Sequence, residues 1–452
     1  MSRQLKVDVL VCGAGCAGVV AALAAARCGA RTLVVERAPF AGGIVTGAGL
    51  PFFDGMAHAG TGEIVVKGIP IELAVGMGLC RPGDTHLDPH NPRMKNVERF
   101  KLLTDELLTS QENLQVLFHT SVCDVEADGG RIKRVLVANK DGLVSVEARQ
   151  IVDTTGDADV AAWAGARVDK NDSLMPMSMH FRVGHVRRRK ESGPRQSDGI
   201  TTNPAEAGIS ARAREHLIRA QEKGDLSMFY GPGIMFPFAD DEAYFHAVRV
   251  SGDATDAADL TRAEMQGRKD AWTIFRILKE NLPEFKDAYF ISSGPFIGIR
   301  ETRRLVGKIV LTEEDIRSAR KFDDAVATGC WYLDVHPNRT TLASANEAPR
   351  EQPDPYDIPY SALLSKEISN LVVAGRCHSA TAVAASSTRV NVTAMAMGQA
   401  AGTGAALAVQ KKDDVGLVDG CEVRSWLQSH GAGPAGPDSS RACSATDPAS
   451  QP

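Results

Sequence analysis

One stretch near the N-terminus, VDVLVCGAGCAGVVAALAAARCGARTLVVER (residues 7–37), restricts the possible folds more than any other part of the chain. Residues 7–12 form an apolar, β-branched run, which is typical of a strand buried on both faces. A G-x-G-x-x-G turn follows, and then an alanine-rich segment that favours a helix and ends near Gly29. A second apolar run, residues 31–35, ends at Glu36. The order strand, turn, helix, strand predicts a parallel βαβ unit.

The three glycines of this turn have separate physical roles. Gly13 permits the tight turn, Gly15 lets a pyrophosphate approach the backbone, and Gly18 lets the helix pack closely against the strand. The helix N-terminus, which includes Ala17, then offers free N–H groups and a positive dipole end to phosphate oxygens. Glu36 lies 23 positions after Gly13, where an acid accepts hydrogen bonds from a ribose 2′-hydroxyl. The unit therefore predicts a Rossmann-like dinucleotide-binding domain, and the acid argues against a 2′-phosphate.

The fingerprint alone does not separate FAD from NAD, because both cofactors share the ADP half. The next stretch, APFAGGIVTGAG (residues 38–49), adds Gly42, Gly43 and Thr46 just after Glu36. Glycines here would again let the backbone approach phosphate closely, although an ordinary flexible loop has the same composition.

Five separated motifs resemble the FAD-dependent oxidoreductases of the glutathione-reductase-like superfamily. Within it, the chain is similar to the group related to the flavin subunit of heterodisulfide reductase, with fumarate-reductase-type flavoproteins as more distant relatives. The resemblance extends from about residue 5 to about residue 410. The motifs are ERAPFAGGIVTG (36–47), LFHTSVCDVEADGGRIKRVLVANKDG (117–142), IVDTTGDADVAAWAGA (151–166), the group MPMSMHFRVG (175–184), GIMFPF (233–238) and IGIRETRRLVGKIVLTEEDI (297–316), and NLVVAGRCHSATAVAASSTRVNVTAMAMGQAAGTGAALA (370–408).

The resemblance implies FAD as the cofactor and an α/β fold, in which an inserted α+β substrate domain interrupts a Rossmann-like FAD-binding domain with a parallel sheet plus β-meander. It places the FAD-binding domain at residues 1–165 and 361–410, the substrate domain at 166–360 and a largely disordered tail at 411–452. The chain would return to the sheet in a last strand at 371–374, and a helix starting near Val390 would direct its N-terminus at the flavin. The positions that match cofactor-binding residues are Gly13, Gly15, Ala17, Gly18, Glu36, Arg37, Gly42, Gly43, Thr46, Val122, Thr155, Gly156, Asp157, Gly375, Arg376, Arg389 and Val390.

The first candidates for the chemistry are basic side chains of the middle segment. Arg300, with Arg303 and Arg304 close by, would clamp a substrate carboxylate, or the segment would be a salt-bridged element of a domain interface. His336 is expected in a loop after a strand, where it would contact substrate or make a structural hydrogen bond. His180, on a strand that could face the substrate, is a further candidate.

His378 is the remaining catalytic candidate. It lies three residues beyond Gly375, near the expected flavin ring, at a position where the related proteins carry an apolar residue. Its alternatives are a general base, a covalent attachment point for the flavin, or a packing residue.

Bulk composition sets the remaining expectations. The net charge of −5 gives no electrostatic reason to expect nucleic acid or an anionic membrane as a partner. No apolar run is expected to be long enough to cross a membrane, and the N-terminus enters a strand directly, so a cytoplasmic location is expected. No cysteines have C-x-x-C spacing, so neither a metal site nor an iron–sulfur centre is predicted.

The predicted function is an FAD-dependent dehydrogenase that transfers a hydride from a small polar organic substrate to flavin N5. A flavin monooxygenase or desaturase, a flavin-bearing electron-transfer subunit of a complex, and a nicotinamide-binding regulatory protein are the alternatives. The electron acceptor and the oligomeric state are left open.

Overall fold

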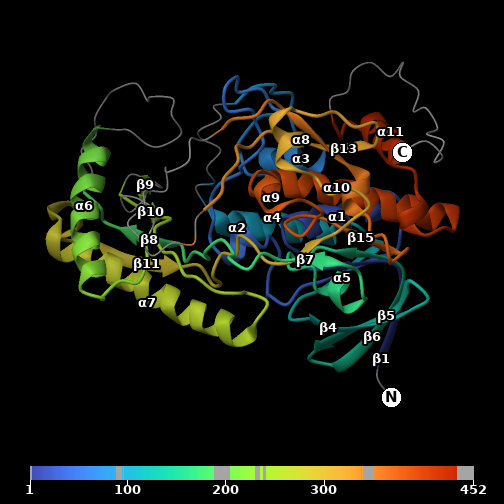
Figure 1. Cartoon of the computed structure of the whole chain (residues 1–452), viewed down its shortest axis with the longest axis horizontal. Coiled ribbons are helices and arrows are strands. Elements are labelled where there is room, and N and C mark those ends of the chain that lie inside the picture. Colours follow the sequence, from blue (N-terminus) through green and yellow to red (C-terminus); the bar gives the residue numbers. More distant parts are fainter. Residues whose placement is uncertain are drawn as a thin grey trace.

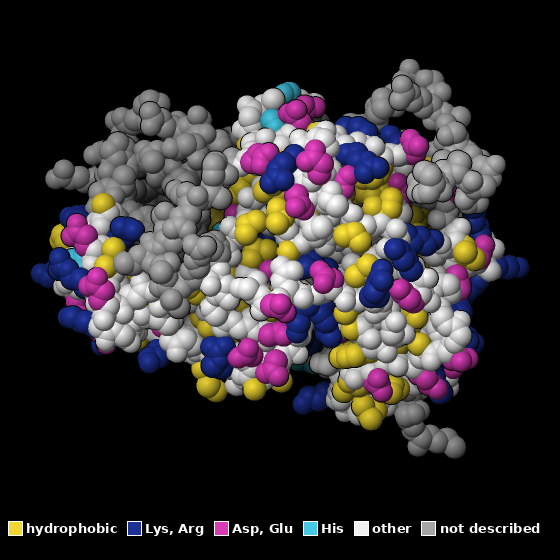
Figure 2. All heavy atoms as spheres, viewed as in Figure 1, with side chains coloured by type: hydrophobic (Ala, Val, Ile, Leu, Met, Phe, Trp, Pro, Cys, Tyr) yellow, Lys and Arg dark blue, Asp and Glu magenta, His cyan; other side chains and the backbone are white. Residues whose placement is uncertain are grey.

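The computed structural model describes residues 3–87, 94, 96–187, 204–229, 235–237, 241–336, 338 and 351–434. Within these residues a larger unit is built around a seven-stranded sheet, and a smaller unit beside it is built around a four-stranded sheet (Figure 1). Lys and Arg side chains are interspersed with Asp and Glu over the face seen in Figure 2. The predicted α/β class is confirmed.

The larger sheet joins parallel strands to an antiparallel meander. Its strand order is β3-β2-β1-β6-β5-β4, and β15 also pairs with β6. The strands are β1 (Arg3–Cys12), β2 (Thr32–Val35), β3 (Leu114–Leu117), β4 (Ser121–Asp128), β5 (Arg131–Asn139), β6 (Gly142–Asp153) and β15 (Leu371–Val373). The first residues of β6 pair with antiparallel β5 and its last residues with parallel β15. The predicted meander and returning strand are therefore both observed.

The parallel strands end at one level. Cys12 of β1 pairs with Val35 of β2 and with Asp153 of β6, and Asp153 pairs in turn with Val373 of β15. Because parallel strands bring their carboxyl ends to the same edge, the four residues that follow them are neighbours in space.

Two helices, α1 (Cys16–Arg27) and α10 (Asn391–Lys411), cover one face of this sheet (Figure 1). They cross at glycines: a Cβ atom at Gly398 would lie 2.1 Å from the Ala17 carbonyl oxygen, and one at Gly402 would lie 2.1 Å from that of Ala21. The other helices of the larger unit are α2 (Ile44–Gly47), α3 (Ile69–Gly76), α4 (Val97–Thr109), α5 (Asp159–Trp163), α8 (Glu313–Arg317), α9 (Ala382–Thr388) and α11 (Gly420–Ser429).

Helix α10 differs from the expectation that no run is apolar enough to span a membrane. Its length and composition meet that requirement, but 94% of its most apolar window is buried inside the protein. Its apolar surface is covered by α1, β13 and the sheet, so the composition follows from its place in the core.

The smaller unit is an antiparallel sheet covered by two helices. Its order is β11-β8-β10-β9, with α6 and α7 beside it (Figure 1). The elements are β8 (Phe181–Gly184), α6 (Pro204–Glu222), β9 (Met235–Pro237), β10 (Ala243–Phe245), α7 (Ala257–Asn281) and β11 (Tyr289–Ser293). Its core extends from Met177 to Ile297 and is separate from the two cores of the larger unit.

The predicted substrate domain, residues 166–360, is too long. Its last part packs in the core of the larger unit, with Leu311, Ile316 and Tyr356 fully buried there. Four short strands of this segment form two separate pairs. β7 (Val168–Asp169) pairs with β12 (Arg304–Leu305), and β13 (Ala325–Gly329) pairs with β14 (Tyr356–Pro359).

The predicted tail is also corrected. Residues 412–434 are ordered, and α11 packs against α10 through the buried side chains of Val423 and Leu427. The Asp419 side chain caps this helix by accepting a hydrogen bond from the Cys421 backbone N–H. Residues 435–452 lie outside the described residues.

Candidate cofactor and substrate site

A cavity of about 790 Å³ follows the edge where the parallel strands end and extends to the smaller unit. The residues directly after β1, β2, β6 and β15 all line it: Gly13, Glu36, Thr154 and Ala374. Ligands of open α/β sheets bind at this edge.

Glycines let two backbone segments meet at the start of α1. Gly13 has φ of +99°, and a Cβ atom there would lie 2.8 Å from the Thr154 carbonyl oxygen. Gly43 has φ of +53°, and its Cβ atom would lie 2.8 Å from the Gly15 Cα atom. Gly15 begins α1 without a side-chain cap, and no acid lies in the first turn, so its backbone N–H groups suit an anionic ligand.

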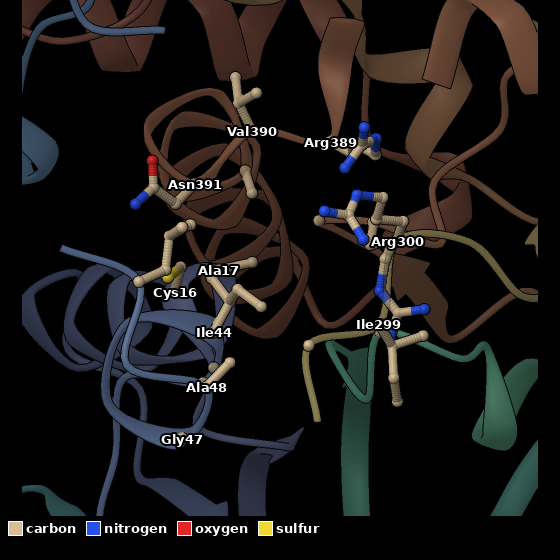
Figure 3. A pocket seen from close by; sticks show the side chains of 18 of the residues that line it. Cys16, Ala17, Ile44, Gly47, Ala48, Ile299, Arg300, Arg389, Val390 and Asn391 are labelled. Atoms are coloured by element: carbon tan, nitrogen blue, oxygen red, sulfur yellow. The ribbon is translucent and has the colours of Figure 1, made fainter. Parts of the chain in front are cut away.

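A second helix N-terminus meets the same cavity. Helix α10 begins at Val390 without a side-chain cap or an acid in its first turn. Figure 3 shows Val390 and Asn391 beside Cys16 and Ala17. The Asn391 amide donates to the Phe52 carbonyl oxygen at 2.5 Å, whereas its own oxygen is buried and has no hydrogen-bond partner among the described residues. Helices α4, α7, α9 and α11 are all capped by side chains, whereas α1 and α10 leave the backbone N–H groups of their first turns open toward the cavity.

Glu36 is held at the end of β2 by two backbone N–H groups. Its carboxylate oxygens accept hydrogen bonds from Ala14 at 2.8 Å and from Ala38 at 2.9 Å. A carboxylate oxygen accepts more than one hydrogen bond, so Glu36 can also accept from a ribose hydroxyl.

Three acids, Asp153, Asp157 and Asp159, lie at the end of β6 and in the turn after it. Asp153 is fully buried and accepts hydrogen bonds from Thr155, and burial raises its pKa. Asp157 forms an ion pair with Arg376 at 2.9 Å. Burial, together with the carboxylates of Asp157 and Asp153, raises the pKa of Asp159 to about 6.

These features fit FAD, because the open helix N-termini and glycine turns suit a pyrophosphate and Glu36 suits a ribose. The predicted cofactor residues that line the cavity are Gly13, Gly15, Ala17, Glu36, Arg37, Gly43, Val122, Thr155, Gly156, Asp157, Gly375, Arg376, Arg389 and Val390. Gly18, Gly42 and Thr46 lie behind this lining. A Cβ atom at Gly18 would lie 1.8 Å from the Gly13 oxygen, so Gly18 allows close packing as its spacing predicted.

Beyond the cofactor-binding edge, the cavity ends in a polar pocket between the two units. Arg300 lies there, on the same side of the pocket as Arg389 and opposite Ile44 and Ala48 (Figure 3). The Arg300 guanidinium donates to the Pro176 carbonyl oxygen at 2.7 Å and to the Ser178 hydroxyl at 2.8 Å.

A chain of four polar side chains joins the two units at this pocket. Arg249 of the smaller unit contacts His336 Nδ1 at 3.4 Å, His336 Nε2 contacts Asp334 at 3.1 Å, and Asp334 pairs with Arg389 at 3.3 Å. Because a carboxylate accepts and a guanidinium donates, His336 has its proton on Nε2. Burial lowers the pKa of His336 to about 3, Arg249 and Arg300 adding to the effect while Asp334 opposes it. Burial opposes ionisation of Asp334, but His336, Arg389 and Arg300 hold its pKa well below the usual value.

The structure does not place every candidate at the pocket. His378 is fully buried outside the cavity lining, where its Nδ1 lies 2.8 Å from the Gly375 oxygen, so its predicted catalytic role is corrected to a packing role. Arg303 pairs with Asp159, and buried Arg304 pairs with Glu301 at 2.8 Å. Of the three neighbouring arginines, Arg300 alone lines the cavity.

The sequence did not single out several residues of the pocket, which are Asp54, His246, Trp331, Tyr332, Asp334 and Asn391. The sequence singled out His180, on a strand that could face the substrate, but not Ser178 beside it: in MPMSMHF, Met177, Met179 and Phe181 enter the core of the smaller unit while Ser178 and His180 line the cavity. This alternation is that of an extended strand between a core and a site.

The cavity combines the carboxyl edge of the parallel sheet, two open helix N-termini and a wall formed by the smaller unit. This arrangement is that of a two-unit flavoprotein oxidoreductase. The chain belongs to the FAD dependent oxidoreductase family, whose model matches residues 8–427. It is an FAD-dependent enzyme, as the sequence predicted. No match is found among the curated proteins.

Solved structures with a similar fold include a geranylgeranyl bacteriochlorophyll reductase-like protein from Thermoplasma acidophilum, at 13% identity and a TM-score of 0.45, covering 95% of this chain and 85% of that one. A p-nitrophenol 4-monooxygenase from Pseudomonas putida matches at 11% identity and a TM-score of 0.43, covering 93% and 84%. Because both scores are below 0.5, we draw no conclusion about activity from them.

Proposed function

We propose that the protein is a dehydrogenase that oxidises a small polar organic molecule by hydride transfer to the flavin. The observation that supports this most is the polar end of the cavity. Arg300, Arg389 and His336 lie there, next to the open N-terminus of α10, within one cavity that also includes the sheet edge.

FAD supplies the two-electron chemistry when it is bound. The chain's own groups have three tasks. The first turn of α10 directs its positive end to the cavity, where it stabilises negative charge on a reduced cofactor. Arg300 and Arg389 bind and orient a polar or anionic substrate. The buried walls from both units exclude water, which strengthens these interactions.

We further propose that the chain is related to the group that its motifs indicate, that of the heterodisulfide-reductase flavin subunit. The support is the order of the five motifs and the return of the chain to β6 through β15. A cytoplasmic location and the absence of nucleic-acid and membrane partners stay predictions.

The test is anaerobic mixing of the purified holoprotein with a panel of alcohols, hydroxy acids, amines, amino acids and reduced nicotinamides. We expect at least one alcohol, acid or amine class to bleach the visible flavin absorption without O2. An Arg300→Gln variant should lose this bleaching and keep its flavin, whereas the control variant His378→Asn should keep both, because His378 lies outside the cavity.

Bleaching by reduced nicotinamide alone, followed by hydroxylation of an added substrate when O2 is admitted, would replace the dehydrogenase with a monooxygenase. A flavin that no member of the panel reduces would refute the proposal and favour an electron-transfer subunit.

A further inference from the structure

His180 occupies the wall of the polar pocket in a fixed orientation. It is 3% exposed and lines the cavity two residues after Ser178. Its Nδ1 atom lies 3.1 Å from the Ala48 carbonyl oxygen. Because a carbonyl oxygen only accepts, Nδ1 holds the ring proton, and Nε2 presents a lone pair.

The lone pair of His180 is not used inside the protein. Nε2 is buried and has no hydrogen-bond partner in the part of the chain that the structure describes. Burial first, and then the charge of Arg300, lower the pKa of His180 to about 3, so the ring is neutral at neutral pH. A buried acceptor without a donor is unfavourable and needs an explanation. A ligand hydroxyl that donates to Nε2 supplies one.

The His246 ring lies between His180 and the guanidinium group of Arg300. His246 stacks on His180 with ring centroids 4.5 Å apart, and its Nε2 lies 2.7 Å from an Arg300 nitrogen. Arg300 also donates to the Ser178 hydroxyl, so the group is held in place. Arg389 lies on the same side of the pocket (Figure 3). The pocket thus joins two cations suited to a carboxylate with one neutral base suited to a hydroxyl.

We propose that the pocket binds a 2-hydroxy carboxylate, with its carboxylate at Arg300 and Arg389 and its hydroxyl on His180 Nε2, and that His180 is the catalytic residue that accepts the hydroxyl proton. This inference rests on the proposed dehydrogenase function.

The reaction balances without a further reactant. The O–H bond of the substrate breaks and its proton passes to Nε2, which becomes a positively charged imidazolium. The C–H bond breaks with its electron pair, and FAD, when bound, would be the two-electron oxidant that takes up this hydride. The substrate loses two electrons and becomes a 2-oxo carboxylate.

Equilibrium binding tests the site independently of turnover. Calorimetry on the anaerobic holoprotein whose flavin has first been reduced, so that no hydride can be transferred, would compare lactate with propionate, which lacks the hydroxyl, and with 2-methoxypropionate, whose oxygen has no proton to donate. We expect the unaltered holoprotein to prefer lactate by roughly threefold to tenfold, since one hydrogen bond to a buried acceptor is involved. Its affinities for the other two acids should be similar.

Two asparagine variants form a matched pair. His180→Asn keeps an N–H donor for Ala48 and removes the Nε2 acceptor, so it should bind lactate and propionate equally. His378→Asn makes the same change at a buried histidine outside the cavity and should keep the preference.

The assignment is overturned if the unaltered protein does not discriminate lactate from propionate, if it binds neither, or if His180→Asn keeps the preference. The comparison of the three acids needs no variant, so misfolding of His180→Asn does not prevent the test. The substrate class and the proposed function can fail separately. Bleaching by alcohols or amines but not by hydroxy acids would refute the substrate class and leave the dehydrogenase function standing.

Discussion

The crossing of α1 and α10 links packing directly to cofactor binding, and Gly398→Ala tests that link. A Cβ atom at residue 398 would lie 2.1 Å from the Ala17 oxygen and 2.8 Å from the Ala17 carbonyl carbon. A carbon–oxygen contact is usually about 3.3 Å or longer, so the helices would have to separate by about 1 Å. Backbone atoms form the obstacle, and no side chain can rotate away.

Two effects of opposite sign set the magnitude. Alanine is favoured over glycine inside a helix by about 1 kcal/mol. Overpacking usually costs about 1–3 kcal/mol, and a backbone clash belongs at the upper end of that range. We therefore expect Gly398→Ala to lower the free energy of unfolding by about 2 kcal/mol. Because Ala17 and Cys16 line the cavity, their displacement should also weaken FAD binding.

Urea unfolding followed by circular dichroism, with the FAD content after gel filtration, measures both effects. Gly267→Ala in α7 is the control, because its Cβ atom would meet only side-chain atoms, at 3.0 Å from Met179 and 3.3 Å from Ile297. We expect it to change stability by less than about 1 kcal/mol and to retain FAD. A Gly398→Ala protein as stable as its parent and with full FAD content would refute the reasoning.

Three further predictions follow from single groups of the site. Glu36→Gln should weaken FAD binding by roughly tenfold or more, since it removes the charge from a hydrogen-bonding carboxylate, and fluorescence titration of the apoprotein would measure the loss; equal affinity would contradict the role of Glu36. Burial lowers the pKa values of His180 and His336 to about 3 and that of His378 to about 4, against 6.5 as the ordinary value. Between about pH 4 and 6.5 the unfolded chain therefore binds protons that the folded protein does not, so stability should fall as pH falls through this window, and His378→Asn should reduce the slope of unfolding free energy against pH by up to one proton. An unchanged slope would show that His378 is not protonated on unfolding. Asp334→Asn should lower the free energy of unfolding by about 2 kcal/mol because it leaves partly buried Arg389 without its carboxylate; thermal melting of the two proteins would measure this, and equal melting temperatures would contradict it.

The cofactor half of the site could be predicted because its geometry is local. Gly13, Gly15 and Glu36 lie within one βαβ unit, and the turn that joins its strands fixes where they point. The substrate half could not, because its members come from separate elements. Ser178 and His180 precede β8, His246 follows β10, and only the pairing of those strands places them beside each other.

His378 shows the limit of reasoning from proximity in the sequence. Gly375 has φ of +87°, and the chain turns there so that Gly375 and Arg376 line the cavity while the His378 ring is directed to the interior. Three residues along a turn were enough to reverse the direction of the side chain. The segment's spacing placed Gly375 and Arg376 at the cavity, but spacing has no information on the direction of a side chain after a positive-φ glycine.

The polar chain from Arg249 to Arg389 indicates that substrate binding and cofactor binding are not independent. Arg389 directly precedes Val390, the residue at which α10 begins beside the cavity. This series of polar contacts connects Arg389 to Asp334, Asp334 to His336, and His336 to Arg249 of the smaller unit. A shift of that unit would therefore break the partly buried Asp334–Arg389 ion pair or move the N-terminus of α10, and both are costly. An anion bound at Arg300 and Arg389 would add a second connection between the units. Substrate and FAD should consequently stabilise each other's binding by the same factor, as reciprocal coupling requires.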